Sequence, residues 1–185
     1  MSWGILKIGR AWRRLARRED GSAAVEFGLV AMPFFLLIVA MGEVSLMAMA
    51  QTNLDFAVHD MARRIRTGQV QTENLSATEV NAEVCSRLNE ILTLQCDGNL
   101  FVDVDTYESF NDVANPTPIR NGELDQGQIS FQPGDPGEIV LVRAFYRWQI
   151  VTPFFGTIFG NVGDDRLMVS SILVRNEPFP VPEED

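Results

Sequence analysis

The stretch "REDGSAAVEFGLVAMPFFLLIVAMGEVSLMAMA", residues 18–50, decides the fold, because a long apolar run follows directly on a charged leader. Residues 27–50 contain no Lys or Arg, and Glu43 is their only charged side chain. A helix over these residues spans roughly 36 Å, which is enough to cross a bilayer. We therefore expect a transmembrane helix over residues 22–50. A single carboxylate, Glu26, lies just inside its start, where burying a charge is costly.

The charges are distributed unevenly along the chain. Lys and Arg number 15 against 25 Asp and Glu, a formal net charge of −10. Residues 1–21 carry six basic and two acidic side chains, so this leader is at +4 and the remainder at −14. Because Lys and Arg resist translocation, the asymmetry predicts a basic cytoplasmic leader, a single pass through a membrane and a C-terminal domain on its outer side. The acidic domain, with scattered basic residues, argues against nucleic-acid binding.

Helical periodicity continues beyond the apolar run. Apolar residues recur there at spacings of three and four: Leu54, Val58, Met61 and Ile65. This pattern predicts one helix over residues 22–67, with an extension at 51–67 outside the membrane. Gly68 is a suitable C-terminal stop, and Pro33 should bend the helix because it lacks an N–H group.

A second helix and the two cysteines follow. Ser76 and Glu79 fit a capping box, and the apolar residues after them recur at four-residue steps, which predicts an amphipathic helix over residues 77–93. Cys85 lies on this helix and Cys96 just beyond it. In an oxidising compartment we expect a disulfide between them; the alternative is two unpaired buried thiols. Two thiols without a nearby His or third Cys make a poor metal site.

Three later stretches, rich in β-branched and aromatic residues, predict strands: 100–110, 138–153 and 166–176. The Pro-rich loop between the first two is too punctuated for regular structure. The glycine-spaced apolar connection 154–165 is expected to lie under the sheet rather than in solvent.

These elements define the fold class. We expect an α+β protein, in which a long N-terminal transmembrane helix extends into a small extracytoplasmic head with one amphipathic helix and a three-stranded antiparallel sheet. The head covers residues 51–176. A Pro-rich acidic tail, 177–185, is expected to stay extended.

Two ordinary interpretations of the apolar run predict different N-termini for the mature protein. A plain signal anchor keeps Met1, but it gives no reason for a carboxylate at Glu26. A removable secretory signal needs a small-x-small cleavage site, which Ala48 and Ala50 supply ahead of Gln51. The run is long for a secretory signal and contains two carboxylates.

A third interpretation uses the spacing of the charged groups. If a peptidase cuts after Gly21, Ser22 becomes the N-terminus, and Glu26 lies one helical turn away. The new amine and the carboxylate of a neighbouring subunit are then able to neutralise each other, which offsets the cost of burying either charge. Arg17 and Arg18 would hold the cleavage site at the cytoplasmic face.

The same residues carry a resemblance to a known family. Gly21 and "SAAVEF", residues 22–27, resemble the prepilin cleavage signal of the tight adherence (Flp) pilus class, in which Gly is followed by Glu and an aromatic residue, here Glu26 and Phe27. The apolar run is similar to that of the TadE-like pseudopilins in particular. Further similar features are Pro33, Gly42, Glu43 and the stretches 146–153 and 171–179.

The resemblance implies a function in pilus assembly. A TadE-like pseudopilin, or minor pilin, has a pilin-like fold and is cut by a membrane prepilin peptidase, here between Gly21 and Ser22. It then takes part with other pilins and pseudopilins of the same pilus, and with the pilus assembly machinery, in building a type IV pilus for surface attachment. The resemblance assigns Glu26 and Phe27 to the assembly charge pair. The large head favours a pseudopilin over a main fibre subunit.

No set of residues supports an enzyme, and no metal or other cofactor is expected. The single histidine, His59, has no Ser or Cys partner, so it is interpreted as a surface residue. "VDVD", residues 102–105, lacks the Gly and distal Glu of a calcium loop and is interpreted as the polar face of a strand. Glu43 is expected at the outer headgroup boundary.

An adhesion protein is the alternative from a different functional class. In this interpretation the chain is an uncleaved, signal-anchored periplasmic binding or adhesion protein. It predicts that the aromatic cluster Phe145, Tyr146 and Trp148 is partly exposed, because a binding head needs accessible aromatic side chains.

Overall fold

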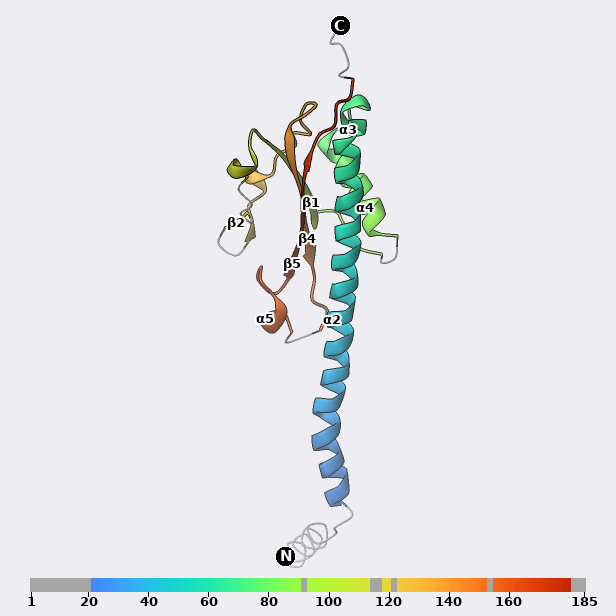
Figure 1. The fold of residues 1–185 in the computed structure, drawn as a ribbon. Helices are drawn as coiled ribbons and strands as arrows, with labels where there is room; N and C mark the ends of the chain where they lie inside the picture. Colours follow the sequence, from blue (N-terminus) through green and yellow to red (C-terminus); the bar gives the residue numbers. More distant parts are fainter. Residues whose placement is uncertain (1–20, 91–92, 114–117, 121–122, 153–154, 181–185) are drawn as a thin grey trace, which may run out of the picture. The chain divides into compact units, whose positions relative to one another are not determined.

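The computed structural model describes residues 21–90, 93–113, 118–120, 123–152 and 155–180. The chain divides into two compact units, Met1–Gly42 and Glu43–Asp185, here called the first and the second unit. Helix α2, Ser22–Arg66, contributes residues to both (Figure 1). The predicted basic leader lies outside the described residues. The α+β fold class is confirmed.

Helix α2 begins and ends within one residue of the predicted bounds. It continues as helix through Pro33. At its C-terminal end Gly68 adopts the left-handed conformation, with φ of 75°. A Cβ atom there would lie 2.2 Å from Cγ of Phe179, so both the backbone and the packing require glycine. The described part of the predicted tail lies against this end of α2, where the Glu177 N–H donates to the Arg66 carbonyl at 2.8 Å.

The predicted three-stranded antiparallel sheet is present in the second unit. Strand β4, Ile139–Trp148, lies between β1, Leu100–Tyr107, and β5, Arg166–Arg175. Two predicted strand ends were wrong. After β1 the chain turns into the 3-10 helix η2, Phe110–Asp112. The Asn111 N–H of this helix donates a hydrogen bond to the Ser109 hydroxyl. After β4 the chain leaves the sheet, and the backbone N–H of Val151 donates to the Glu43 carboxylate of α2.

One face of the sheet is covered by helices. The capping box of Ser76 and Glu79 starts α4, Ala77–Leu88, as predicted, and the short α3, Gln69–Thr72, precedes it. Helix α4 ends before the predicted residue 93, because the side chain of Asn89 accepts the N–H of Leu94 at 2.6 Å and turns the chain. The helices and the even-numbered residues of β1 and β4 form one core, which includes Leu54, Val58, Ile65, Val80, Val84, Val104, Val140 and Val142.

The opposite face of the sheet is covered by connecting segments. Contrary to the prediction for the Pro-rich loop, this loop contains a short hairpin, β2 (Ile119–Arg120) and β3 (Glu123–Leu124), and the 3-10 helix η3, Gln126–Gln128. The connection between β4 and β5 contains α5, Gly156–Phe159. Val162 of this connection is buried under the sheet, as predicted, but Ile158 is 66% exposed, contrary to the prediction.

The predicted disulfide is present in the structure. Cys85 on α4 is bonded to Cys96, with 6.0 Å between their Cα atoms. The bond connects α4 to the segment that leads into β1. Backbone N–H groups of Asn99 and Leu100 both donate to the Cys96 carbonyl, so this segment also forms a tight turn.

We expect the double substitution Cys85→Ser and Cys96→Ser to lower the free energy of unfolding by about 3 kcal/mol, because the unfolded chain regains the entropy of an open loop. Chemical denaturation of both proteins measures the difference, and reduced wild-type protein should match the variant. Mass spectrometry without reduction should find the two cysteines in one cross-linked peptide. Free thiols in protein isolated from the membrane would contradict the assignment.

Candidate functional site

The start of α2 brings Ser22 and Glu26 together. The Ser22 hydroxyl donates to Oε1 of Glu26 at 3.1 Å, as expected for residues one helical turn apart. Gly21, directly before the helix, is exposed, and an ideal Cβ at this position would meet nothing within 4 Å. Within the described residues, the backbone from Gly21 onward is therefore open to another molecule.

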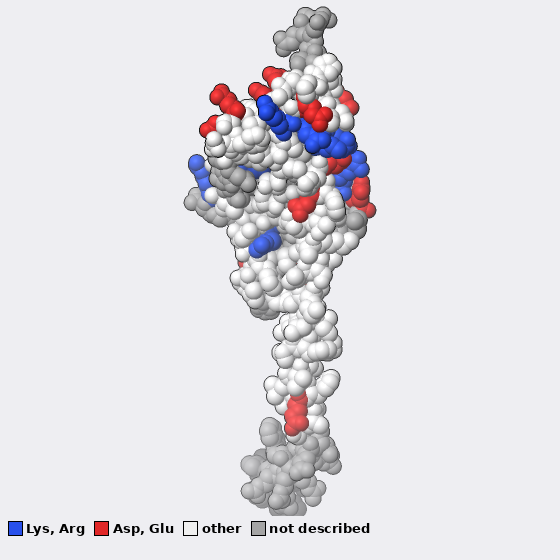
Figure 2. Space-filling model, viewed as in Figure 1, with Lys and Arg blue, Asp and Glu red and all other residues white. Residues whose placement is uncertain are grey.

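The surface of the described part of the first unit, residues 21–42, is apolar apart from this carboxylate. Figure 2 shows the segment almost entirely white, and Glu26 is the only charged residue in 22–42. Its large apolar side chains from Val25 to Met41 are 47–72% exposed. Soluble proteins rarely expose so many contiguous large apolar side chains, and such a surface marks contact with a membrane or another protein. Among the described residues α2 is the one helix long and apolar enough to cross a membrane, and it fits a single-pass anchor.

Among the described residues, Glu26 forms a hydrogen bond but no ion pair. A carboxylate in an apolar environment is costly unless it is paired with a cation and hydrogen-bonded. The neutral Ser22 hydroxyl supplies one hydrogen bond and no charge. A free amine on the Ser22 backbone would add a positive charge at the same residue. The geometry thus suits a carboxylate whose cationic partner is an N-terminal amine.

A comparison with protein families covers this segment. Residues 21–63 match the family model described as TadE-like protein. This segment of the chain is TadE-like. The resemblance stated from the sequence is thereby confirmed. No curated protein and no solved structure matches the chain.

The TadE-like match reaches beyond the apolar surface. It begins at Gly21, includes Glu26 and Phe27, and ends at Arg63 near the end of α2. The matched residues therefore include both the exposed apolar part of α2 and the part that contributes to the core of the second unit.

Glu43 has a structural role that the sequence analysis missed. Its side chain is only 6% exposed. Oε1 accepts the indole N–H of Trp148 at 3.1 Å and the backbone N–H of Val151 at 3.4 Å, and Oε2 accepts the hydroxyl of Thr152 at 2.9 Å. These bonds attach the end of β4 to the first residue of the second unit. A partial signal was available, because Trp148 has an N–H group that needs an acceptor when buried.

Of the remaining candidate residues, His59 lies on the surface and the acidic stretch has a structural role. His59 is exposed, as predicted. Asp103 of the "VDVD" stretch is 1% exposed and opposes Arg143 across the β1–β4 pair. Arg143 Nε donates to Asp103 at 2.8 Å, and Arg143 Nη2 lies 3.1 Å from Asp105. This face of β1 is thus polar, but it is buried rather than solvated.

Proposed function

We propose that this protein is a minor pilin, or pseudopilin, of a tight adherence type IV pilus. In this proposal a prepilin peptidase cuts after Gly21, and the apolar part of α2 then packs against other pilins and pseudopilins during assembly. The protein resides in the inner membrane with its N-terminus in the cytoplasm and the second unit in the periplasm. Its role is structural rather than enzymatic.

The single observation that carries the proposal is the pairing geometry at the start of α2. Glu26 is the one charged residue on an exposed apolar segment, and Ser22 is bonded to it. Cleavage before Ser22 would create an amine there, and a neighbouring subunit's Glu26 would compensate it in lipid. The TadE-like match over the same residues supports this interpretation.

Two further observations support the proposed location. The disulfide of Cys85 and Cys96 is of the kind that persists in oxidising compartments such as the periplasm. The exposed apolar surface of the first unit extends to Met41, and residues 22–42 are about 32 Å long as a helix, close to the thickness of the hydrocarbon core. We therefore propose that the membrane-spanning part is residues 22–42, shorter than the expected 22–50.

The alternative, an adhesion protein with an exposed aromatic cluster, loses its candidate binding surface. Phe145 is 0% exposed, Tyr146 is 5% exposed and Trp148 is 8% exposed. The expectation of a partly exposed cluster is therefore wrong. All three rings pack into the two cores of the second unit, and the Trp148 indole N–H also donates to Glu43.

N-terminal sequencing of the protein from membranes tests the proposed function. We expect Ser22 as the first residue. In a Gly21→Val variant we expect Met1, because a β-branched side chain obstructs the cleavage site. Gly28→Ala is a matched control, since a Cβ at Gly28 meets nothing within 4 Å, and it should still give Ser22. Wild-type protein beginning at Met1 would support a plain anchor, and protein beginning at Gln51 a secreted form.

A further inference from the structure

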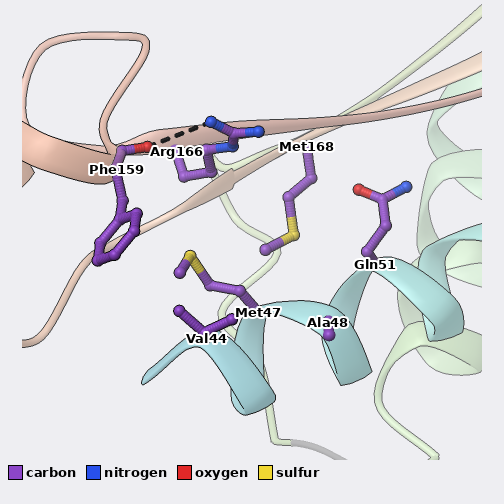
Figure 3. Close-up of a pocket in the computed structure, with 7 residues that line it drawn as sticks. All are labelled: Val44, Met47, Ala48, Gln51, Phe159, Arg166 and Met168. Atoms are coloured by element: carbon purple, nitrogen blue, oxygen red, sulfur yellow. Dashed lines mark hydrogen bonds between the residues drawn. The ribbon is translucent and has the colours of Figure 1, made fainter. Parts of the chain in front are cut away.

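An apolar surface lies at one end of the second unit. Val151 is 80% exposed and Ile158 is 66% exposed. A groove of about 310 Å³ lies between α2, β5 and α5, and Phe159, the residue after Ile158, lines it. Val151 does not line this groove but bonds Glu43, the residue before the groove-lining Val44. Figure 3 shows Val44 and Met47 of α2, Met168 of β5 and Phe159 of α5 directed toward this space. Val151, Ile158 and the groove are together called the base surface.

The base surface is tied to the point where the first unit joins the second. The Val151 N–H donates to Glu43 Oε1, and the Thr152 hydroxyl donates to Oε2. Glu43 is covalently bonded to Gly42, the last residue of the first unit. If the apolar segment leaves the bilayer at Gly42, Glu43 is the next residue. Val151 then lies one side-chain length from that point, because its N–H bonds the Glu43 carboxylate.

The distribution of charge in the second unit agrees with this position. On the face shown in Figure 2, Lys, Arg, Asp and Glu side chains gather toward the end that carries α3, and the end that carries α5 is almost all white. The groove is lined by one charged residue, Arg166, whose guanidinium donates to the Phe159 carbonyl at 3.3 Å, and Asp164 and Asp165 precede it in the sequence. Since both signs are present, apolar contact rather than charge attraction would dominate binding.

We propose that the base surface is a lipid contact: Val151, Ile158 and the groove beside Met47 lie in the interfacial layer of the membrane that the first unit crosses. The inference rests on the proposed membrane anchoring. A lipid is favoured over a second copy as the occupant because, while the first unit is inserted, the covalent link at Gly42 keeps Val151 close to the bilayer, which corresponds to a very high effective concentration of lipid. Exposed apolar side chains gain free energy on entering this layer.

Fluorescence quenching in nanodiscs with one full-length chain per disc tests the proposal. An environment-sensitive fluorophore is attached to Val151→Cys or Ile158→Cys, since the native cysteines are bonded to each other and do not react. Uncharged phosphatidylcholine carrying a quencher near the headgroup is compared with the same lipid without it. We expect both labelled positions to lose most of their fluorescence in the quenching lipid.

Two further labelled variants make the result decisive. Phe110→Cys is a negative control, because Phe110 is 57% exposed and follows the end of β1 that pairs with Ile139, about 30 Å along the sheet from Trp148. Val30→Cys, in the first unit, reports membrane insertion in a parallel lipid that carries its quencher in the acyl chain, because residue 30 lies about 12 Å inside the proposed span. Quenching at 30 without extra quenching at 151 and 158 relative to 110 would overturn the lipid contact and leave the anchor intact.

Two other outcomes also decide against the proposal. No quenching at 30 would overturn both the anchor and the lipid contact. Burial of the labels at 151 and 158 only when each disc holds two chains would assign the base surface to contact between copies, and the lipid proposal would be wrong.

Discussion

Replacement of Arg143 by methionine is expected to lower the free energy of unfolding by about 3–5 kcal/mol, because it leaves a buried carboxylate without its cation. Asp103 is 1% exposed, and the Arg143 side chain is 7% exposed. The guanidinium also lies 5.7 Å from the centre of the Phe145 ring. Since small domains are stable by only about 5–15 kcal/mol, this change removes a large part of the total.

The effect should depend on pH in a defined direction. Burial raises the pKa of Asp103, although the Ser130 N–H and the Arg143 guanidinium oppose the rise. A raised pKa in the folded state means that the charged carboxylate disfavours folding, so the stability linked to this group falls as pH rises. Without Arg143 this penalty grows. The deficit of the variant should therefore shrink as the pH is lowered and Asp103 becomes protonated.

Thermal unfolding of the full-length protein in detergent, at neutral and at acid pH, measures this prediction. Arg147→Met is the matched control, since Arg147 lies on the same strand and the structure gives it no ion pair with any described residue. The double variant Asp103→Leu and Arg143→Met should be more stable than Arg143→Met alone, because it buries no unpaired charge. Equal small losses for Arg143→Met and Arg147→Met would show that the buried pair is unimportant.

Substitution of Glu26 by leucine is expected to reduce incorporation into pili by more than about tenfold, since close charge pairs at interfaces contribute roughly 1.5–7 kcal/mol and each 1.4 kcal/mol is a factor of ten. Membrane insertion should be preserved, because leucine is more favourable than glutamate in an apolar helix. The measurement compares the amount of protein in sheared surface pili with the amount left in membranes. Cleavage before Ser22 should be nearly unchanged.

Two variants separate charge from packing. Glu26→Gln keeps an oxygen that accepts the Ser22 hydroxyl but removes the charge, so it should fail in assembly much as Glu26→Leu does. Val25→Leu places the same new residue at an adjacent exposed position and should assemble normally. Normal assembly of Glu26→Gln would mean that the hydrogen bond suffices and the charge is not needed.

The features that sequence analysis predicted well are local ones. The capping box of Ser76 and Glu79, the glycine stop at Gly68 and the span of α2 each depend on residues close together in the chain. The three strands were found from their composition, because β-branched and aromatic residues cluster in them. The start of the TadE-like segment was found because Gly21 and Glu26 form a compact motif.

The features that were missed depend on distant pairs. Glu43 bonds a residue 105 positions later, and Arg143 is 40 positions from Asp103. Such pairings follow from strand register and helix docking, which periodicity does not specify. The exposed Ile158 was missed for a related reason, since an apolar loop has the same composition whether it lies under the sheet or at its end.

The account's central claim is that the Ser22 amine of one subunit compensates the Glu26 carboxylate of another. A lipid-soluble carbodiimide, which joins an amine and a carboxylate in direct contact as an amide with loss of water, tests this claim in assembled pili. Pili built from equal amounts of ¹⁴N- and ¹⁵N-labelled protein distinguish links between chains from links within one chain. We predict a mixed-isotope peptide in which the Ser22 amine is bonded to Glu26. Links confined to single chains, or a Ser22 amine that never forms one, would contradict the account.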